Sequence, residues 1–225
     1  MADTVYVSRP CCWAPGVVTP EDWDAWAAGT VAIERTTAAP KLEFTDALFR
    51  RRLGQLCKMT VQVVHDALEA TGCGDIPLVF VSTRGEVTRE FTVNRTLIED
   101  SMVLPAAFSL SVFNAPIALA TISCHLTSGY SVIFPSKGNV AEAFAAAAAP
   151  LVCGEAERLL FVYGDELVPE AYGALRPADN TPLAFAAVVS RTRPSFPATA
   201  VRPFAGTVPR SPAAFLAALL FQGAL

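Results

Sequence analysis

The residues best placed for chemistry follow a short apolar run near the middle of the chain. Ser131 to Phe134 is typical of a buried strand and Asn139 to Ala149 of a helix, and a tight turn with Pro135, Ser136 and Lys137 separates them. Many α/β enzymes carry a nucleophile between a strand and a helix N-terminus, because the amide dipoles there lower a thiol pKa or stabilise an oxyanion. Proline, serine and lysine supply no thiol. The sequence therefore predicts the architecture of an active site without an obvious nucleophile, which favours a non-catalytic role.

Other pairs of residues have the types needed for a nucleophile and its base. Cys124 and His125 are adjacent, as are His65 and Asp66, but side chains one position apart on a helix do not face each other. We therefore expect neither pair to act together. The Ser-Thr-Arg-Gly loop at residues 82–85 follows an apolar strand and could hold a ligand, although it lacks the glycines of a phosphate-binding loop.

Composition argues against several classes of function. Hydrophobic residues make up 52% of the chain and charged residues 17%, which predicts a large buried core, a large partner interface, or both. The formal net charge of −4 gives no electrostatic support for binding nucleic acid. The six cysteines form no Cys-x-x-Cys pair and the chain has two histidines, so we expect small buried thiols, no metal and no cofactor.

No segment of the sequence reads as a membrane span. The most apolar run, from Leu104 to Leu126, is interrupted by polar residues and by Pro116, so a buried helix is the better interpretation. The first residues, Met-Ala-Asp-Thr, lack the basic start and apolar core of a signal peptide. We therefore expect a cytoplasmic protein that binds neither a membrane nor nucleic acid.

Strand-like and helix-like segments alternate along the chain, which predicts a layered α/β fold. Continuous apolar runs, as at Leu78, Val132 and Leu160, are typical of strands that are covered on both faces. The expected strands are Val5–Val7, Leu78–Val81, Ser131–Phe134, Arg158–Tyr163 and Leu183–Val189. The expected helices are Pro20–Ala28, Asp46–Ala70, Glu86–Glu99, Pro105–His125 with a kink or break at Pro116, Asn139–Ala149 and Ala213–Phe221. Residues 193–212 are expected to be an irregular proline-rich segment within a single domain of residues 1–225.

Three segments occur in an order that is informative. They are residues 49–59 (Phe-Arg-Arg-Arg-Leu-Gly-Gln-Leu-Cys-Lys-Met), residues 108–115 (Phe-Ser-Leu-Ser-Val-Phe-Asn-Ala) and residues 134–138 (Phe-Pro-Ser-Lys-Gly). They resemble, in turn, an early helix of β-ketoacyl synthases, the helix before the nucleophile strand and the turn that carries the reactive cysteine. The closest resemblance, over Val5 to Val189, is to the short ketosynthase-like proteins that act as chain length factors in aryl polyene gene clusters. It implies a thiolase-like fold, namely one mixed-sheet half of a ketosynthase with helices on both faces.

The resemblance implies a catalytically silent subunit. Pro135 stands at the position of the acyl-accepting cysteine, and Ser136 is no thiol and has no base beside it in sequence. The catalytic histidines of the family come from a C-terminal half that is missing here, and neither His65 nor His125 lies in a matching position. We therefore expect a chain length factor that forms a heterodimer with a full-length β-ketoacyl synthase in aryl polyene biosynthesis, a route related to fatty-acid and polyketide synthesis. It would meet the acyl carrier protein only indirectly.

The resemblance also implies where the partner binds, because the strand before the nucleophile turn pairs across the two-fold axis of ketosynthase dimers. The helix around residues 108–119 would lie near the acyl tunnel of the partner, and bulky side chains there would limit the chain length by occupying volume. Four residues of this helix, spaced three or four apart, could share one helix face: Leu110, Phe113, Asn114 and Ile117. They would form either a tunnel or interface stripe or ordinary core. The candidate tunnel and interface residues are Phe108, Leu110, Phe113, Asn114, Ile117, Val132, Ile133 and Phe134.

The basic residues Arg50, Arg51, Arg52 and Lys58 could attract an acidic acyl carrier protein. Consecutive arginines point in different directions on a helix, so solvated surface or internal ion pairs are the plainer interpretation. Two rival functions stay open. One is an acyltransferase or hydrolase that uses Ser136, and the other is a scaffold that binds acyl carrier proteins through these basic residues.

Overall fold

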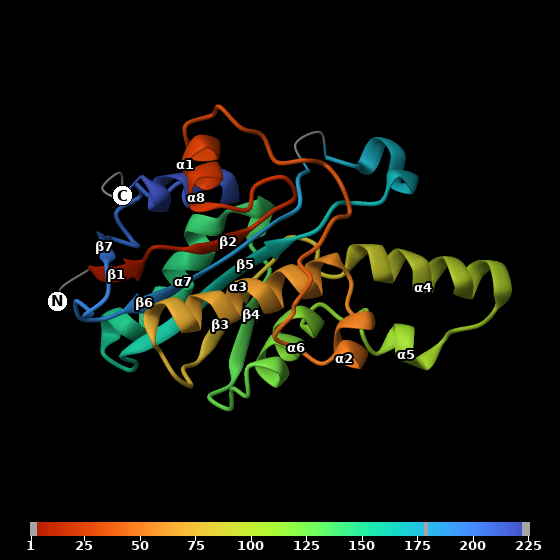
Figure 1. Ribbon diagram of the computed structural model, residues 1–225, viewed down its shortest axis with the longest axis horizontal. Helices are drawn as coiled ribbons and strands as arrows, with labels where there is room; N and C mark the ends of the chain where they lie inside the picture. Colours follow the sequence, from red (N-terminus) through yellow and green to blue (C-terminus); the bar gives the residue numbers. More distant parts are fainter. Residues whose placement is uncertain (1–3, 178–179, 222–225) are drawn as a thin grey trace.

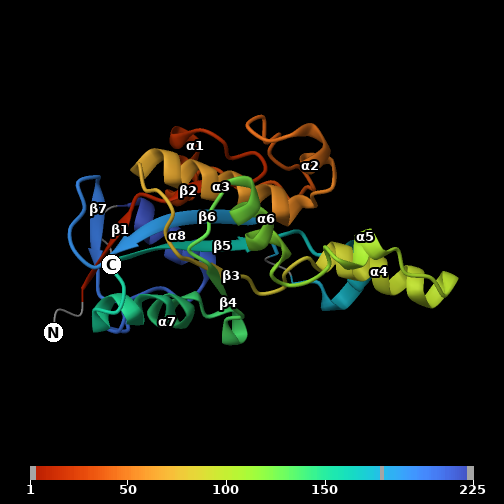
Figure 2. The ribbon, with the colours of Figure 1, turned by 90° about the horizontal axis from the view of Figure 1, so that it is seen from below.

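The computed structural model describes residues 4–177 and 180–221, which form a mixed β-sheet with helices packed on both faces (Figure 1, Figure 2). Residues 1–3, on which part of the signal-peptide expectation rests, lie outside the described range. In the described ranges, no helix combines the length and the apolar character that crossing a bilayer requires.

Seven strands are found in the described residues, and they form one sheet in the order β4-β3-β5-β6-β1-β7, with β2 pairing with the first half of β6. β3 runs parallel to both β4 and β5, so the carboxyl ends of these three strands lie at the same end of the sheet. β6 runs antiparallel to β5 and to β1. The strands are β1 (Val5–Ser8), β2 (Cys11–Trp13), β3 (Leu78–Val81), β4 (Tyr130–Ile133), β5 (Arg158–Asp165), β6 (Leu183–Ser190) and β7 (Ala198–Val201).

The helices divide between the two faces of the sheet. α3 (Gln55–Thr71) and α6 (Ala115–Ser123) pack on one face, and α7 (Val140–Cys153) and α8 (Pro212–Leu220) on the other. Successive side chains of a strand point to opposite faces, so β5 sends Phe161 and Tyr163 towards α7 and α8, and Leu160 and Val162 towards α3. The other helices are α1 (Pro20–Ala27), α2 (Ala47–Arg51), α4 (Val87–Asp100) and α5 (Pro105–Phe108), and there are short 3₁₀ turns η1 (Ser136–Gly138) and η2 (Glu170–Leu175).

Two helices that the sequence predicted as long are each divided. The predicted helix Asp46–Ala70 is α2 followed by α3, and Gly54 between them has an extended backbone and begins α3. The predicted helix Pro105–His125 is α5 followed by α6, with six non-helical residues between Phe108 and Ala115. Pro116 lies in the first turn of α6. Proline has no N–H to donate, and the first turn of a helix is where that loss costs nothing.

The prediction of a buried strand before the nucleophile turn was wrong for β4. Tyr130 and Ser131 are exposed because, among the strands that the structure describes, β4 is the last of the sheet and pairs with β3 alone. The prediction of an irregular segment at residues 193–212 was also incomplete, since β7 lies within it. β7 has no apolar run of its own, and it is ordered by pairing with the distant β1.

Candidate functional site

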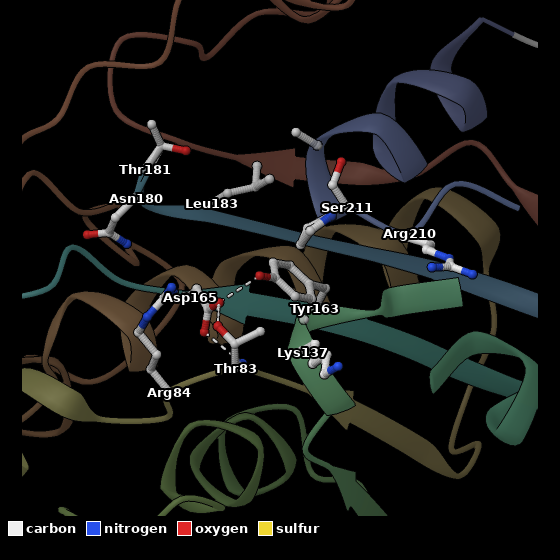
Figure 3. A pocket seen from close by; sticks show the side chains of 13 residues that line it. Thr83, Arg84, Lys137, Tyr163, Asp165, Asn180, Thr181, Leu183, Arg210 and Ser211 are labelled. Carbon is white, nitrogen blue, oxygen red and sulfur yellow. Dashed lines mark hydrogen bonds and ion pairs between the residues drawn. The ribbon is translucent and has the colours of Figure 1, made fainter. Parts of the chain in front are cut away.

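A pocket of about 510 Å³ opens at the carboxyl ends of β3 and β5 (Figure 3). The loop after β3, the turn after β4, the end of β5 and the start of α8 all contribute to its lining. In open α/β sheets, ligands bind in the crevice outside the carboxyl ends of the strands. The topology therefore marks this pocket as the candidate functional site.

Asp165, at the end of β5, organises one side of the pocket (Figure 3). Its Oδ1 accepts hydrogen bonds from the Ser82 hydroxyl at 2.8 Å and from the Thr83 N–H at 3.0 Å. Its Oδ2 accepts from the Tyr163 hydroxyl at 2.7 Å, from the Arg84 guanidinium at 3.3 Å and from the Thr83 hydroxyl. The carboxylate is 3% exposed, and five donors satisfy it. Asp165 is therefore a structural anchor and has no free lone pair with which to act as a general base.

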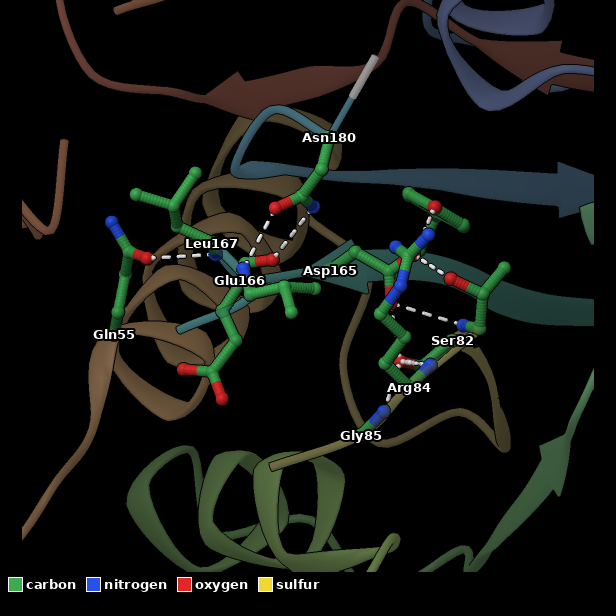
Figure 4. Close-up of polar contacts among 11 residues, drawn as sticks. Gln55, Ser82, Arg84, Gly85, Asp165, Glu166, Leu167 and Asn180 are labelled. Carbon is green, nitrogen blue, oxygen red and sulfur yellow. Dashed lines mark hydrogen bonds and ion pairs between the residues drawn. The ribbon is translucent and has the colours of Figure 1, made fainter. Parts of the chain in front are cut away.

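The same contacts fix the loop after β3. The Ser82 hydroxyl also accepts from the N–H of Gly85 at 2.9 Å, so the loop turns tightly (Figure 4). Gly85 has φ +60°, and a Cβ there would lie 2.7 Å from the ring of Phe113, so this position requires glycine. Sequence reasoning noted the loop but missed Asp165. The available signal was an acidic residue at the carboxyl end of a buried strand.

The turn after β4 supplies no nucleophile with a base. Pro135 is buried, and Ser136, which begins η1, is exposed. Within the described residues, the hydroxyl of Ser136 makes no hydrogen bond. Lys137 follows with φ +52°, and the side chain of Asn139 caps α7 by accepting from the N–H of Glu142 at 3.4 Å. This turn resembles a nucleophile turn in its geometry alone.

The two histidines do not line this pocket. The Nδ1 of His65 lies 3.1 Å from Asp66 Oδ1, so the expectation that these neighbours could not meet was wrong. Both side chains are partly exposed, and the ring of His65 stacks on Phe44. Burial and the negative charges of Asp66 and Glu69 raise the pKa of Cys124 to about 11, so its thiol stays protonated at neutral pH.

The predicted four-residue stripe does not share a helix face. Leu110, Phe113 and Asn114 precede α6, and only Ile117 lies within it, fully buried against α3. Phe113 and Asn114 instead lie near β4: the ring of Phe113 is 6.2 Å from that of Phe134, which follows the strand, and Asn114 Nδ2 donates to the hydroxyl of Tyr130, the first residue of β4, at 2.9 Å. The structure thus brings part of the predicted set together on one side of β4.

The outer edge of β4 has no partner strand in the described residues. The N–H of Leu78 donates to the C=O of Gly129 at 3.1 Å, and the N–H of Ser82 donates to the C=O of Ile133 at 3.4 Å. In a parallel ladder, only every second residue bonds to a given neighbour. The N–H and C=O of Val132 therefore point to the open edge, where they are available to another strand.

Exposed large apolar side chains concentrate in the part of the chain that leads up to and includes β4. Of the fifteen large hydrophobic residues that are exposed in the described part of the chain, nine lie between residues 97 and 134. Phe134 is 65% exposed and Phe108 is 58% exposed. The first part of this segment includes the end of α4 and all of α5, which extend beyond the sheet (Figure 1, Figure 2). A concentration of this kind is typical of an interaction surface.

The predicted basic cluster is spread over two helices. Arg50 and Arg51 lie in α2, Arg52 follows it, and Lys58 lies in α3. The guanidinium of Arg50 donates to the C=O of Thr45 at 3.2 Å, so it holds the preceding loop. Arg51 and Arg52 are exposed, in agreement with the interpretation as solvated surface.

A second buried polar group lies where α3 and α4 begin, and sequence reasoning missed it. Glu86 and Glu166 are each 2% exposed. Glu86 Oε1 accepts from the N–H of Cys57, in the first turn of α3, at 3.2 Å, and Glu166 Oε1 accepts from the N–H of Thr88, in the first turn of α4, at 2.8 Å. Each carboxyl group thus accepts one of the backbone N–H groups that a helix N-terminus leaves without an intrahelical partner. Arg89 Nε donates to Glu86 Oε2 at 3.2 Å and partly balances the charge.

The chain just beyond β5 is held in place by side-chain amides (Figure 4). Gln55 Oε1 accepts from the N–H of Leu167 at 3.2 Å. Asn180 accepts from the N–H of Val168 at 2.7 Å and donates to the C=O of Glu166 at 3.2 Å. These contacts connect α3 to the segment that carries Glu166 and the pocket.

The strand order and the helices on both faces define a thiolase-like α/β fold. The family model of the β-ketoacyl synthase N-terminal domain matches residues 23–210. The chain therefore belongs to the β-ketoacyl synthase N-terminal domain family. Among curated protein sequences, none matches this chain.

Solved structures with this fold include ketosynthases and ketosynthase complexes. The ketosynthase ApeO in complex with its chain length factor ApeC, from Xenorhabdus doucetiae, is 22% identical with a TM-score of 0.74, over 84% of this chain and 79% of that chain. The ishigamide ketosynthase/chain length factor is 13% identical with a TM-score of 0.62, over 83% and 62% of the two chains. The type II AntDE:AntF complex, an acyl carrier protein with its ketosynthase bound to the hexaketide, is 14% identical with a TM-score of 0.64, over 85% and 64%. At these identities the likeness is one of fold, and this chain spans less than two thirds of the second and third structures.

Proposed function

We propose that this chain is a chain length factor, a ketosynthase-like subunit without catalysis of its own that pairs with a full-length β-ketoacyl synthase in aryl polyene biosynthesis. The observation that carries the proposal is the turn after β4. It has the strand, the tight turn and the helix of a nucleophile site, with Pro135 buried in place of a cysteine. A decarboxylating condensation needs a thiolate and a base, and the described residues that line the pocket beside this turn include no cysteine and no histidine.

The lengths of the compared chains support the same proposal. The aligned region is 84% of this chain and 79% of the matched chain in the ApeO–ApeC structure, so the two chains are nearly equal in length. That structure contains a ketosynthase with its chain length factor, and the ishigamide structure is likewise a ketosynthase/chain length factor. The sequence and the comparisons therefore favour the same class of subunit.

The open edge of β4 supports pairing with a ketosynthase. A strand that leaves Val132 N–H and C=O unpaired can extend the sheet into a partner. The exposed apolar residues around Phe134 and Phe108 would be buried in the same contact, as is usual for obligate interfaces. We propose that Phe113 and Phe134, whose rings contact each other, face the acyl tunnel of the partner and limit the space in it.

Co-expression with the ketosynthase of the same gene neighbourhood tests this pairing. We expect a stable heterodimer that makes polyene chains of defined length, because the open edge of β4 would be covered by the partner. Val132→Pro removes the edge N–H but no bond to β3, whereas Val132→Ala keeps the N–H and serves as the matched control. The proline variant should lose co-purification at least tenfold while the alanine variant keeps it. Equal recovery of both complexes would contradict the proposed interface.

The rival functions predict different results. An acyltransferase or hydrolase that uses Ser136 would form a stoichiometric adduct with acyl-CoA, and Ser136→Ala would remove it. A carrier-protein scaffold would lose carrier binding on charge reversal at Arg51 and Arg52 but keep the ketosynthase. If the chain alone condenses malonyl units, the proposal of a non-catalytic subunit is wrong.

A further inference from the structure

The pocket at the carboxyl ends of β3 and β5 carries an excess of positive charge. Of the side chains that line it in the described residues, Arg84, Lys137 and Arg210 are cationic and only Asp165 is anionic. The chain as a whole has a formal net charge of −4, so the lining of this pocket is more positive than the chain as a whole. Figure 3 shows Arg84 on one side of Asp165 and Tyr163, and Lys137 and Arg210 on the other.

The single carboxylate of the pocket does not neutralise all three cations. Arg84 contacts Asp165 at 3.3 Å, and four further donors complete the coordination of that carboxylate. Lys137 and Arg210 form no ion pair with any residue that the structure describes. Two cationic side chains of the lining therefore have no protein counter-ion in the described part of the chain.

Backbone structure adds to this positive potential. The nine-residue helix α8 begins at the pocket, with Ser211, Pro212 and Ala213 in the lining. The N-terminus of a helix carries a partial positive charge and favours anions. The C=O of Arg210 accepts from the N–H of Val140 at 2.9 Å, which ties the start of α8 to the start of α7 and to the turn with Lys137.

The size and lining of the pocket restrict the ligand further. A volume of about 510 Å³ lies in the range of pockets that enclose small organic molecules and exceeds what a bare inorganic ion fills. Leu183, Pro212 and Ala213 give the pocket an apolar wall beside its cations. A ligand with an anionic end and a short organic body matches both features.

We propose that this pocket binds a small organic oxyanion, a carboxylate or a phosphate ester, through Lys137 and Arg210. The proposal does not rest on the proposed function, because it concerns this chain without its partner. It assigns a ligand to a pocket in which Asp165 is saturated and whose described lining residues include no other carboxylate and no histidine. Such a ligand would bind without being converted, and it would stabilise the turn after β4 and the start of α8 together.

Calorimetric titration of the full chain tests the proposal, with malonate and inorganic phosphate as probes at constant ionic strength and malonamide as the neutral analogue of malonate. We expect saturable binding of at least one anion, none of malonamide, and weaker binding as sodium chloride is added. Malonate alone would identify a carboxylate ligand, and phosphate alone a phosphate ester.

The variant Lys137→Gln/Arg210→Gln should weaken binding at least a hundredfold, because it removes two charge-assisted contacts. Both side chains are exposed, so the variant is expected to fold, which circular dichroism can verify. Lys41→Gln, which removes an exposed charge that does not line the pocket, is the matched control and should bind like the parent chain. Absence of saturable binding for both anions, or unchanged affinity in the double variant, would overturn the proposal.

Discussion

Replacing Glu166 by glutamine is expected to remove much of the pH dependence of stability between pH 5 and pH 8. Glu166 is 2% exposed and lies near the Glu86 carboxylate, which is equally buried. Burial and, next, the negative charge of Glu86 raise the pKa of Glu166 from 4.5 to about 7, although the N–H of Thr88 opposes the shift. The other charged group that contacts this pair is Arg89, and Cys57 donates to Glu86 as a neutral thiol, because burial holds its pKa well above the ordinary value.

The sign of the effect follows from proton binding. The folded protein keeps a proton on Glu166 that the unfolded chain loses between pH 4.5 and about 7. The resulting stabilisation is complete below pH 4.5 and is lost as the pH rises through about 7. For these two pKa values, the free energy of unfolding should fall by roughly 2–3 kcal/mol between pH 5 and pH 8 from this group alone.

Urea unfolding at several pH values, followed by tryptophan fluorescence, measures the effect. The glutamine variant keeps an oxygen that can accept from Thr88 N–H and cannot ionise, so it should be more stable than the parent chain at pH 8 by roughly 2 kcal/mol and similar to it at pH 5. Glu155→Gln, at an exposed position, is the matched control and should change neither value by more than about 0.5 kcal/mol. If the difference between the parent and the Glu166 variant is the same at pH 5 and pH 8, the reasoning is refuted.

Two further substitutions test the loop after β3 by the same unfolding measurement. Gly85→Ala should destabilise the protein by roughly 2–4 kcal/mol, because it places a side chain at φ +60° and a Cβ 2.7 Å from the Phe113 ring; a loss below about 0.5 kcal/mol would contradict the requirement for glycine. Asp165→Asn should cost about 3–5 kcal/mol, since it leaves Arg84 without its counter-charge and directs an amide donor at other donors; normal stability would show that Asp165 is not the anchor described above.

Local sequence signals predicted an element well where the residues of that element themselves carry the signal. The apolar runs of β3, β5 and β6 fall at the expected positions, since fully covered strands need apolar residues on both faces. The caps of α1 and α8 also follow from sequence, because Thr19 and Ser211 bond to backbone N–H groups only three residues away. Helix periodicity alone could not divide α2 from α3, because the apolar spacing continues across Gly54. The start of α3 involves Glu86, which is distant in sequence and accepts from the N–H of Cys57.

The candidate site depended on longer distances along the chain. The turn with Pro135 and Ser136 was recognisable because strand, turn and helix are consecutive. The pocket beside it was not, because Arg84, Lys137 and Arg210 come from three distant segments that only the sheet brings together. Likewise, no local pattern indicates that Glu86 and Glu166 lie close together. Glu86 precedes α4 and Glu166 follows β5, and the packing of these two elements brings them near each other.

The sequence by itself determined that this chain carries a strand–turn–helix unit whose turn, Pro-Ser-Lys, contains no thiol, because that statement needs only consecutive residues. The tertiary structure alone decided that β4 is an edge strand and that its turn adjoins a positively charged pocket. Strand order and the meeting of distant segments are set by the packing of the whole sheet between its two helix layers, and no local stretch of sequence encodes them.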